Sequence, residues 1–561
     1  MPKLQHANHA SSFRHGQHHV QQITDLLGWP ELVDPPVNGS YYNDAVDDHS
    51  ASVAAATRRW SQRFYVDERF WCGGACPVFL LIGGEGPQGP PTPRLLLWHL
   101  ARKHSALMLA IEHRFYGESR PTDSLTVSSL RLLTSGQALA DIVRFIGYVS
   151  SVEPGVPDGS SSPPLLLKRG AARGAWVAFG GSYAGALTAW LKLKYPWAVT
   201  AAVASSAPVY PLFDFRQYAQ VTGSALAYSP IGGSQACLGV LHAGAEELAV
   251  AVSGGALALR SRRCPLPAAL CPCTSAETRL DTAAYYSSIL AQFQSVAQFN
   301  QQGRFPDVAD VCEVTLSAWK WYGGGGGGPG GGGGGGSSGG GFSFPLAALA
   351  TVLSLFSRNA TSPRCVKASF AADEVAPLLD SSYSARGCDR TCRSDRQWAW
   401  QCCNEFGFFQ TATGSDPNPF GAWGDVLDID TAGRQLCLAA FGLKGYSGPA
   451  AGPTGLAAIV EYGGRHVLGT NITFSSGSMD PWHALGVVPE SDPYFGVGGG
   501  GQALGKGVTL IEIDGGSHVR DMYAPHAFER ALIPLRPIAD SASLRAAHAA
   551  IEAQVAQYVS M

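Results

Sequence analysis

The sequence has very little net charge and no long uninterrupted apolar run. Its 561 residues include 40 Lys and Arg against 43 Asp and Glu, which leaves a formal charge of −3. A balance this close to neutral supplies no basic surface for nucleic acid, so that class of partner is disfavoured. No apolar run approaches the roughly 18 to 20 residues that a membrane span needs. We therefore expect a soluble globular protein with no integral membrane segment.

Zinc-type cysteine spacing is also missing, although the chain has 13 cysteines. Two lie near the start, at Cys72 and Cys76, and the other eleven lie between residues 237 and 437. Because paired CxxC motifs are absent, disulfide bonds in an oxidising compartment are the better interpretation, and the odd count leaves one thiol over.

The evidence for export is divided. Sequons at Asn38, Asn359 and Asn471 agree with a secreted, glycosylated protein. The first 22 residues, however, lack the apolar segment of a signal peptide. Either a leader is missing from this chain or the inference of export is wrong. Five of the 15 histidines fall in the first 19 residues, and we interpret them as part of a disordered tail rather than a metal site.

Apolar strands alternate with helical patterns from about residue 60. Buried strands are predicted at 77–84, 105–114, 175–179 and 201–209, and an amphipathic helix at 137–149. This alternation predicts a mostly parallel sheet with helices on both faces, which is an α/β fold.

The alternation stops after about residue 212 and resumes after about residue 460. The segment between is rich in cysteine and mostly helical or irregular in pattern, and a glycine run at 323–341 predicts a flexible surface loop. Strands return at 466–476 and 507–514, and a helix is expected from Ser543 to Val559. An insertion above the carboxyl ends of the strands would form a cap over the site. The expected division is a poorly ordered extension (1–57), a first α/β part (58–212), a helical cap (213–460) and a second α/β part (461–561).

A serine stands at the turn between a predicted strand and a predicted helix. The segment Gly180-Gly181-Ser182-Tyr183-Ala184 is close to the G-x-S-x-G pattern of a nucleophile elbow, with alanine in the last position. Small residues around Ser182 allow a tight turn that would expose its hydroxyl above the sheet edge. The alternative is an ordinary serine in a glycine-rich loop.

A nucleophilic serine needs a histidine base and a carboxylate, in the chain order Ser, Asp, His for this fold. Asp480 follows one of the returning strands and His518 follows the next. Because the carboxyl ends of parallel strands meet at one edge of a sheet, we expect Ser182, Asp480 and His518 to form a catalytic triad. The competing candidates are His483 as base and Asp514 or Asp521 as carboxylate.

An oxyanion hole would complete such a site. One backbone N–H is expected from Tyr183, the residue after the nucleophile, and the other from the loop after strand 77–84, at Gly84 or Glu85. A structural turn is the alternative for that loop.

Seven segments together resemble one family of peptidases. They are IGGEGP (82–87), EHRFYGES (112–119), QALAD (137–141), GGSYAG (180–185), RQWAWQCCNEFGFFQT (396–411), SSGSMDPWHALG (475–486) and GGSHVRDMY (515–523). The set is similar to the serine carboxypeptidase S28 family, and most like its thymus-specific branch. The resemblance implies an α/β-hydrolase fold with a helical, disulfide-bearing cap, and it places the family's triad on Ser182, Asp480 and His518. Two departures concern specificity, since Val519 replaces a second histidine and Gly136 replaces a glutamate found in other branches.

The resemblance also implies cleavage of small peptides beside proline or another small residue. Trp482 and Tyr183 are the expected apolar walls of the substrate pocket. Glu85 or Glu405 would bind a substrate ammonium, whereas Arg114 would bind a substrate carboxylate. Each of these charged residues has a structural ion pair as its alternative, so the polarity of cleavage stays open.

The sequence therefore predicts a serine exopeptidase that forms an acyl-enzyme and uses neither metal nor organic cofactor. Its partners would be peptide substrates, and a homodimer is possible. An esterase with the same triad and an inactive hydrolase-like binding protein are the alternatives. The resemblance implies a lysosome or vacuole, or secretion.

Overall fold

The computed structural model describes residues 39–49, 58–150, 172–258, 264–302, 306–321, 343–356, 365–383, 394–414, 417–443, 455–496, 502–525 and 540–561. The glycine run at 323–341, the histidine-rich start, and the sequons at Asn38 and Asn359 lie outside these residues.

An eight-stranded sheet forms the base of the molecule, in the order β1-β2-β4-β3-β5-β6-β8-β10. The first two strands are antiparallel to their neighbours and the other six are parallel. The strands are β1 (Ser40–Val46), β2 (Arg59–Asp67), β3 (Val78–Ile82), β4 (Leu107–Ile111), β5 (Trp176–Gly181), β6 (Ala201–Ser205), β8 (Ile472–Gly477) and β10 (Val508–Ile513). This architecture is the predicted α/β-hydrolase fold.

Helices cover both faces of the sheet because its central strands are apolar on both sides. In β3, Val78, Leu80 and Ile82 face one core, and Phe79 and Leu81 face the other. Helices α4 (Ser135–Ser150) and α5 (Tyr183–Lys194) pack on the first face, and α2 (Leu96–His104) and α15 (Ala542–Val559) on the second. A short helix, α3 (Val127–Leu130), precedes α4.

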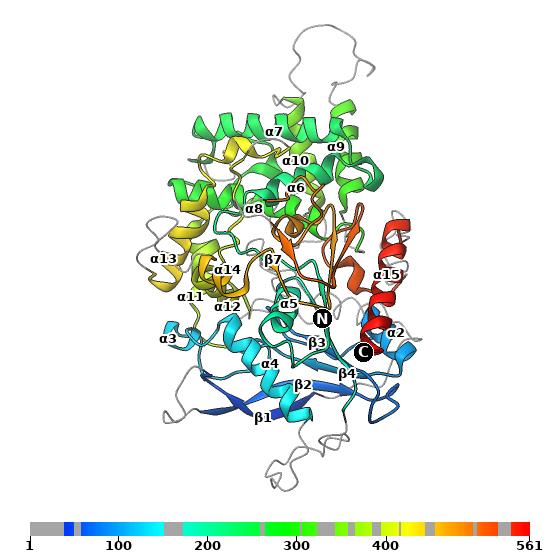
Figure 1. Ribbon diagram of the computed structural model, residues 1–561. Coiled ribbons are helices and arrows are strands. Elements are labelled where there is room, and N and C mark those ends of the chain that lie inside the picture. The colour runs from blue at the N-terminus through cyan, green and yellow to red at the C-terminus, as the bar shows by residue number, and fades with distance from the viewer. Residues whose placement is uncertain are drawn as a thin grey trace, which may run out of the picture.

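The chain between β6 and β8 builds a helical cap, defined here as α6 to α14, which lies above the sheet in Figure 1. Its helices are α6 (Gln217–Ala227), α7 (Gln235–Ser253), α8 (Arg279–Gln298), α9 (Val308–Trp321), α10 (Phe344–Phe356), α11 (Ala376–Leu379), α12 (Asp395–Gln401), α13 (Gln435–Phe441) and α14 (Leu456–Tyr462). The cap has a hydrophobic core of its own, centred on α6 to α10.

One cap helix, α7, is long and apolar enough to cross a membrane by length and composition. No uninterrupted apolar run marks this helix in the sequence, because His242 and the pair Glu246 and Glu247 interrupt it. In the folded chain α7 packs against α9 and α10 and is joined to α9 by a disulfide bond. Helices in the core of a globular protein meet the same criterion, so this one is weak evidence for a membrane span.

Five disulfide bonds are formed by the described cysteines, four of them in the cap. The pairs are Cys72–Cys76, Cys237–Cys312, Cys264–Cys271, Cys273–Cys365 and Cys403–Cys437. Cys402 is a buried free thiol, and Cys388 and Cys392 lie outside the described residues. The prediction of a disulfide-bearing cap is therefore confirmed.

Removing the Cys237–Cys312 bond should destabilise the protein strongly. The bond closes a loop with a sequence separation of 75, and the chain-entropy relation gives about 4 kcal/mol for a loop of that length. The double variant Cys237→Ser/Cys312→Ser should lose about that much unfolding free energy in urea titrations. The same change at Cys264–Cys271, with a separation of 7, is the control and should cost only about 2 kcal/mol. Equal losses for the two pairs would contradict the loop-length argument.

Two expectations about strands were wrong. The sheet begins before residue 58, because β1 pairs with β2 inside the segment expected to be poorly ordered. The single strand expected at 466–476 is divided, since Asn471 takes a left-handed φ of 58°. As a result His466–Val467 (β7) pairs with Ala503–Leu504 (β9) in a separate sheet, and only β8 joins the main one.

Candidate active site

Ser182 sits on a strained turn between β5 and α5. Its φ of 60° and ψ of −133° are unusual for a residue with a side chain and are typical of strained functional positions. The glycine before the turn is sterically required, because a Cβ on Gly180 would lie 2.3 Å from the Ala184 carbonyl oxygen. The side chain of Ser182 is half-buried at the carboxyl end of β5. These are the features of the predicted nucleophile elbow.

Asp480 and His518 form a buried pair at the carboxyl ends of β8 and β10. His518 Nδ1 lies 2.9 Å from both carboxylate oxygens of Asp480, and the two residues are 1% and 0% exposed. Since a carboxylate only accepts hydrogen bonds, Nδ1 carries the proton and Nε2 is left as the acceptor. His518 Nε2 is buried and has no hydrogen-bond partner within the described part of the chain.

The loop that carries His518 lies directly against the elbow. A Cβ on Gly181, the residue before Ser182, would meet Met522 Sδ at 2.2 Å and Val519 Cγ1 at 2.8 Å. The flanking residues of the serine and the histidine are therefore in contact. The Ser182 hydroxyl does not hydrogen-bond to His518 Nε2 in this conformation, as is common for catalytic contacts that tighten only when substrate binds.

The three competing candidates have other partners. His483 faces Asp492, with 3.3 Å between Nε2 and Oδ2; burial alone would lower the pKa of His483, but the hydrogen bond and charge of Asp492 outweigh it and raise that pKa. Asp514 accepts a hydrogen bond from the Tyr228 hydroxyl. Asp521 accepts hydrogen bonds from serine hydroxyls at the ends of β6 and β8. The geometry thus favours Asp480 and His518 over these residues.

The loop after β3 approaches the first turn of α5. A Cβ on Gly84 would lie 3.3 Å from Ala184 Cβ and 3.4 Å from its backbone nitrogen, so this backbone comes close to the elbow at the positive end of the helix dipole. The carboxyl of Glu85 is in the same region. Burial raises the pKa of Glu85, and a hydrogen bond from its own backbone N–H and the proximity of His518 oppose this only in part.

Trp482 lies beside the Asp480–His518 pair. Its backbone N–H donates to Asp480 Oδ1 at 3.0 Å, and its ring centroid is 6.2 Å from that of His518. Phe215, Tyr218 and Phe408 surround the same indole. An aromatic wall therefore adjoins the candidate histidine.

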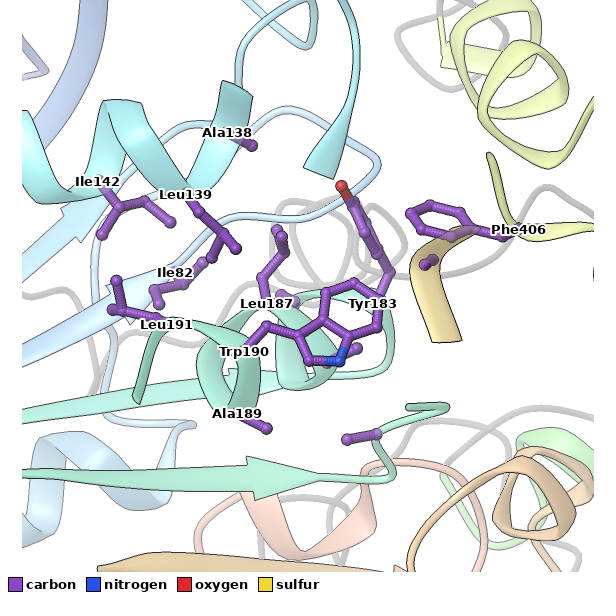
Figure 2. Close-up of a cluster of buried hydrophobic side chains, with 14 of the residues drawn as sticks. Ile82, Ala138, Leu139, Ile142, Tyr183, Leu187, Ala189, Trp190, Leu191 and Phe406 are labelled. Atoms are coloured by element: carbon purple, nitrogen blue, oxygen red, sulfur yellow. The ribbon is translucent and has the colours of Figure 1, made fainter. Parts of the chain in front are cut away.

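The side chain of Tyr183 was wrongly expected to form a second pocket wall. It is 1% exposed and lies beside Phe406 in the core shown in Figure 2. Its hydroxyl is 3.1 Å from His113 Nε2 and accepts a hydrogen bond of 2.9 Å from Gln401 Nε2. Burial lowers the pKa of His113 to about 4, so this network is neutral. It anchors the residue whose backbone N–H is the expected oxyanion donor.

Two charged residues considered for the ends of a peptide are engaged elsewhere. Arg114 is fully buried and binds both carboxylate oxygens of Asp141 and the carbonyl of Val46, Asp47 and Leu132. Glu405 accepts hydrogen bonds from the backbone N–H of Ser135 at 3.1 and 3.0 Å, and another from its hydroxyl. Burial raises the pKa of Glu405 to about 7. Arg114 therefore has the structural ion pair that was its alternative, whereas Glu405 is held by hydrogen bonds from an uncharged serine.

Anchoring residues around His518 have no signal in the sequence. The Val519 N–H donates to Ser206 Oγ at 2.8 Å, and Gln302 Nε2 donates to the His518 carbonyl at 2.6 Å. Both pairs are more than 200 residues apart in the sequence, so no local pattern indicates them. Among the described residues, no group of three or more His, Cys, Asp or Glu is placed to hold a metal ion.

Comparisons with known proteins identify the family to which the chain belongs. The sequence profile of the serine carboxypeptidase S28 family matches residues 47–534. Thymus-specific serine protease of Mus musculus is 32% identical over 515 residues, which are 90% of this chain and 85% of the mouse protein. Lysosomal Pro-X carboxypeptidase of Bos taurus is 33% identical over 184 residues, 31% of this chain and 32% of its own. A probable extracellular serine carboxypeptidase of Arthroderma benhamiae is 26% identical over 439 residues, 77% of this chain and 56% of its own. The chain therefore belongs to the serine carboxypeptidase S28 family and is a serine peptidase.

Proposed function

We propose that this serine peptidase is an exopeptidase that uses Ser182, His518 and Asp480 as its catalytic triad. The observation that carries the proposal is the buried Asp480–His518 pair, with 2.9 Å between Nδ1 and the carboxylate, together with the contact between the His518 loop and the elbow of Ser182. An unpartnered Nε2 beside a strained serine is what a general base requires before substrate arrives.

In the proposed mechanism, Ser182 Oγ attacks the scissile carbonyl while His518 Nε2 takes its proton. Asp480 fixes the imidazole tautomer and stabilises the imidazolium that forms. The backbone N–H groups of Tyr183 and of the Gly84–Glu85 segment stabilise the oxyanion. The imidazolium returns the proton to the leaving amine. A water molecule then attacks the acyl group while His518 Nε2 takes its proton, and that proton passes to Ser182 Oγ as the acyl group leaves.

We propose that Trp482 forms part of a pocket for proline or another small residue. A proline ring needs a flat apolar wall, and the indole lies within 6.2 Å of the His518 ring, centroid to centroid. The name of the bovine relative, a Pro-X carboxypeptidase, is consistent with a pocket of this kind.

Of the charged residues considered for binding a chain end, Glu85 is the one left available. Arg114 and Glu405 are bound within the protein, whereas the carboxyl of Glu85 lies close enough to His518 to interact with it electrostatically. A carboxylate beside the triad attracts a substrate ammonium and repels a substrate carboxylate. We therefore propose release of short units, such as dipeptides, from the amino end.

Replacing Glu85 with glutamine should raise KM for peptides with a free amino terminus about tenfold, because a charge-assisted contact is lost. Acetylated peptides should be affected much less.

The raised pKa of Glu85 also predicts how KM depends on pH. The carboxylate loses its charge at a higher pH than an ordinary glutamate, so the wild-type KM should rise as the pH falls through the acid range. Glu118→Gln, at an exposed position in the same half of the fold, is the control. An equal KM change for free and acetylated peptides would contradict the assignment of Glu85.

The experiment that tests the proposed function is mass spectrometry of products from two matched peptides, one with proline second from the amino end and one with proline second from the carboxyl end. We expect a released amino-terminal dipeptide from the first and little cleavage of the second. Removal of a single residue from the carboxyl end would reverse the polarity, and hydrolysis of simple esters with no peptide cleavage would favour an esterase.

We also propose that the protein passes through the secretory pathway. The five disulfide bonds of the described chain support this, because such bonds persist in oxidising compartments. Relatives named as lysosomal and extracellular peptidases agree with it.

A further inference from the structure

The backbone of His518 is held by the cap rather than by the sheet. Its N–H donates to the carbonyl of Gln298, the last residue of α8, at 3.0 Å. Its carbonyl accepts from Gln302 Nε2 at 2.6 Å. Both hydrogen-bonding groups of the histidine's own backbone therefore end on one five-residue segment, Gln298–Gln302.

Ser517 extends the same contact. Its hydroxyl donates to the carbonyl of Asn300 at 2.7 Å, and Gln302 Nε2 also lies 3.1 Å from that hydroxyl. Asn300 and Gln302 are 1% and 8% exposed, so water does not compete for these bonds. The segment is held in an irregular shape, since Gln301 has a left-handed φ of 56°.

Beyond His518 the chain turns immediately to the sheet. Val519 has a φ of 50°, which is costly for a β-branched residue, and its N–H donates to Ser206 Oγ at 2.8 Å. The imidazole therefore stands between two anchors, the cap segment before it and the end of β6 after it. Loss of the cap anchor would leave the strained turn at Val519 free to relax and move the ring.

From this geometry we propose that Gln302 is a positioning residue for His518, and that the cap uses it to set the alignment of the histidine with Ser182. The proposal rests on the proposed function of His518 as general base. Gln302 does not reach substrate; it acts by holding the peptide plane from which the imidazole extends. Small displacements of a catalytic group cost up to about 100-fold in rate, which sets the size of the expected effect.

The test compares three variants of the full-length protein. Gln302→Ala removes the donor, and Gln302→Glu keeps the shape but offers the His518 carbonyl only acceptors while the carboxyl is ionised. Gln294→Ala is the matched control, because Gln294 is a 2% exposed glutamine in α8, one turn before Gln298. We would measure kcat and KM on a peptide, the rate of covalent labelling of Ser182 by a fluorophosphonate, and the melting temperature.

We expect Gln302→Ala to lower kcat about 10- to 100-fold with KM changed less than threefold, and to slow labelling in the same proportion. Gln302→Glu should be as impaired at neutral pH but recover relative to the wild type as the pH falls, because a protonated carboxyl can donate to the carbonyl again. Gln294→Ala should keep kcat near the wild-type value even if its melting temperature falls.

Two results would overturn the inference: unchanged kcat and labelling rate in Gln302→Ala, or equal losses in Gln302→Ala and Gln294→Ala that follow the melting temperature. These results are distinct from failure of the proposed function, which would appear as an unlabelled, inactive wild-type protein.

Discussion

Ser182→Ala is expected to lower peptide turnover about 10⁶-fold, to the level that substrate binding and the oxyanion donors sustain alone. The variant removes the attacking oxygen while leaving the fold intact, because the side chain lost is small and half-buried. Peptide binding, measured as the affinity of a non-hydrolysed product or inhibitor, should change less than a few-fold.

Two comparisons make this result specific. The melting temperature of Ser182→Ala should match the wild type within a few degrees. Ser128→Ala, at an exposed position in α3, should retain full turnover. Activity of Ser182→Ala within tenfold of the wild type would mean that the elbow does not carry the nucleophile.

Asp480→Asn is expected to lower kcat about 10⁴-fold. The carboxylate accepts the proton of His518 Nδ1, whereas an amide can turn its N–H₂ toward that nitrogen and force the proton onto Nε2. The imidazole would then face Ser182 as a donor and could not take its proton. The loss should appear in kcat far more than in KM, because the side chain of Asp480 is fully buried.

The control for Asp480→Asn is Asp514→Asn, the carboxylate that follows β10 directly. Asp514 is exposed and accepts a hydrogen bond from Tyr228, so its replacement should change kcat less than threefold. If Asp514→Asn were the inactive variant, the carboxylate of the triad would have been assigned to the wrong strand end.

The elements that the sequence predicts well are those with a local signal. Strands such as β3 and β4 are unbroken apolar runs, and they are buried on both faces of the sheet. The elbow is indicated by the glycines that precede Ser182, and Gly180 has no room for a Cβ. Asp480 and His518 could be assigned because parallel strands place their following loops at one edge.

The residues that sequence reasoning misplaced depend on contacts made at long range. Tyr183 looks like a pocket wall from its position beside Ser182, but Gln401 and Phe406 of the cap enclose its side chain. Glu405 was considered for binding a substrate ammonium, but its carboxyl accepts a hydrogen bond from Ser135, the first residue of α4. The strand β1 lies in the segment predicted to be poorly ordered, and its partner β2 begins only after residues 47–58, so no local signal indicates the pairing.

The contacts that anchor His518 could not be predicted from the sequence either, because their partners lie in the cap. The segment Gln298–Gln302 is separated from His518 by more than 200 residues, and glutamine and asparagine side chains have no strong preference that marks such a role. Only the folded chain brings them to the histidine's backbone. In the proposed mechanism the reacting groups thus follow strands of the sheet, while the cap holds the backbone of His518.

Covalent labelling followed by peptide mass spectrometry tests the central claim most directly. A fluorophosphonate should modify one residue per chain, in the peptide that contains Ser182, and replacing His518 with alanine should reduce the labelling rate by several orders of magnitude. Labelling of a different residue, or labelling of Ser182 at the same rate without His518, would contradict the account.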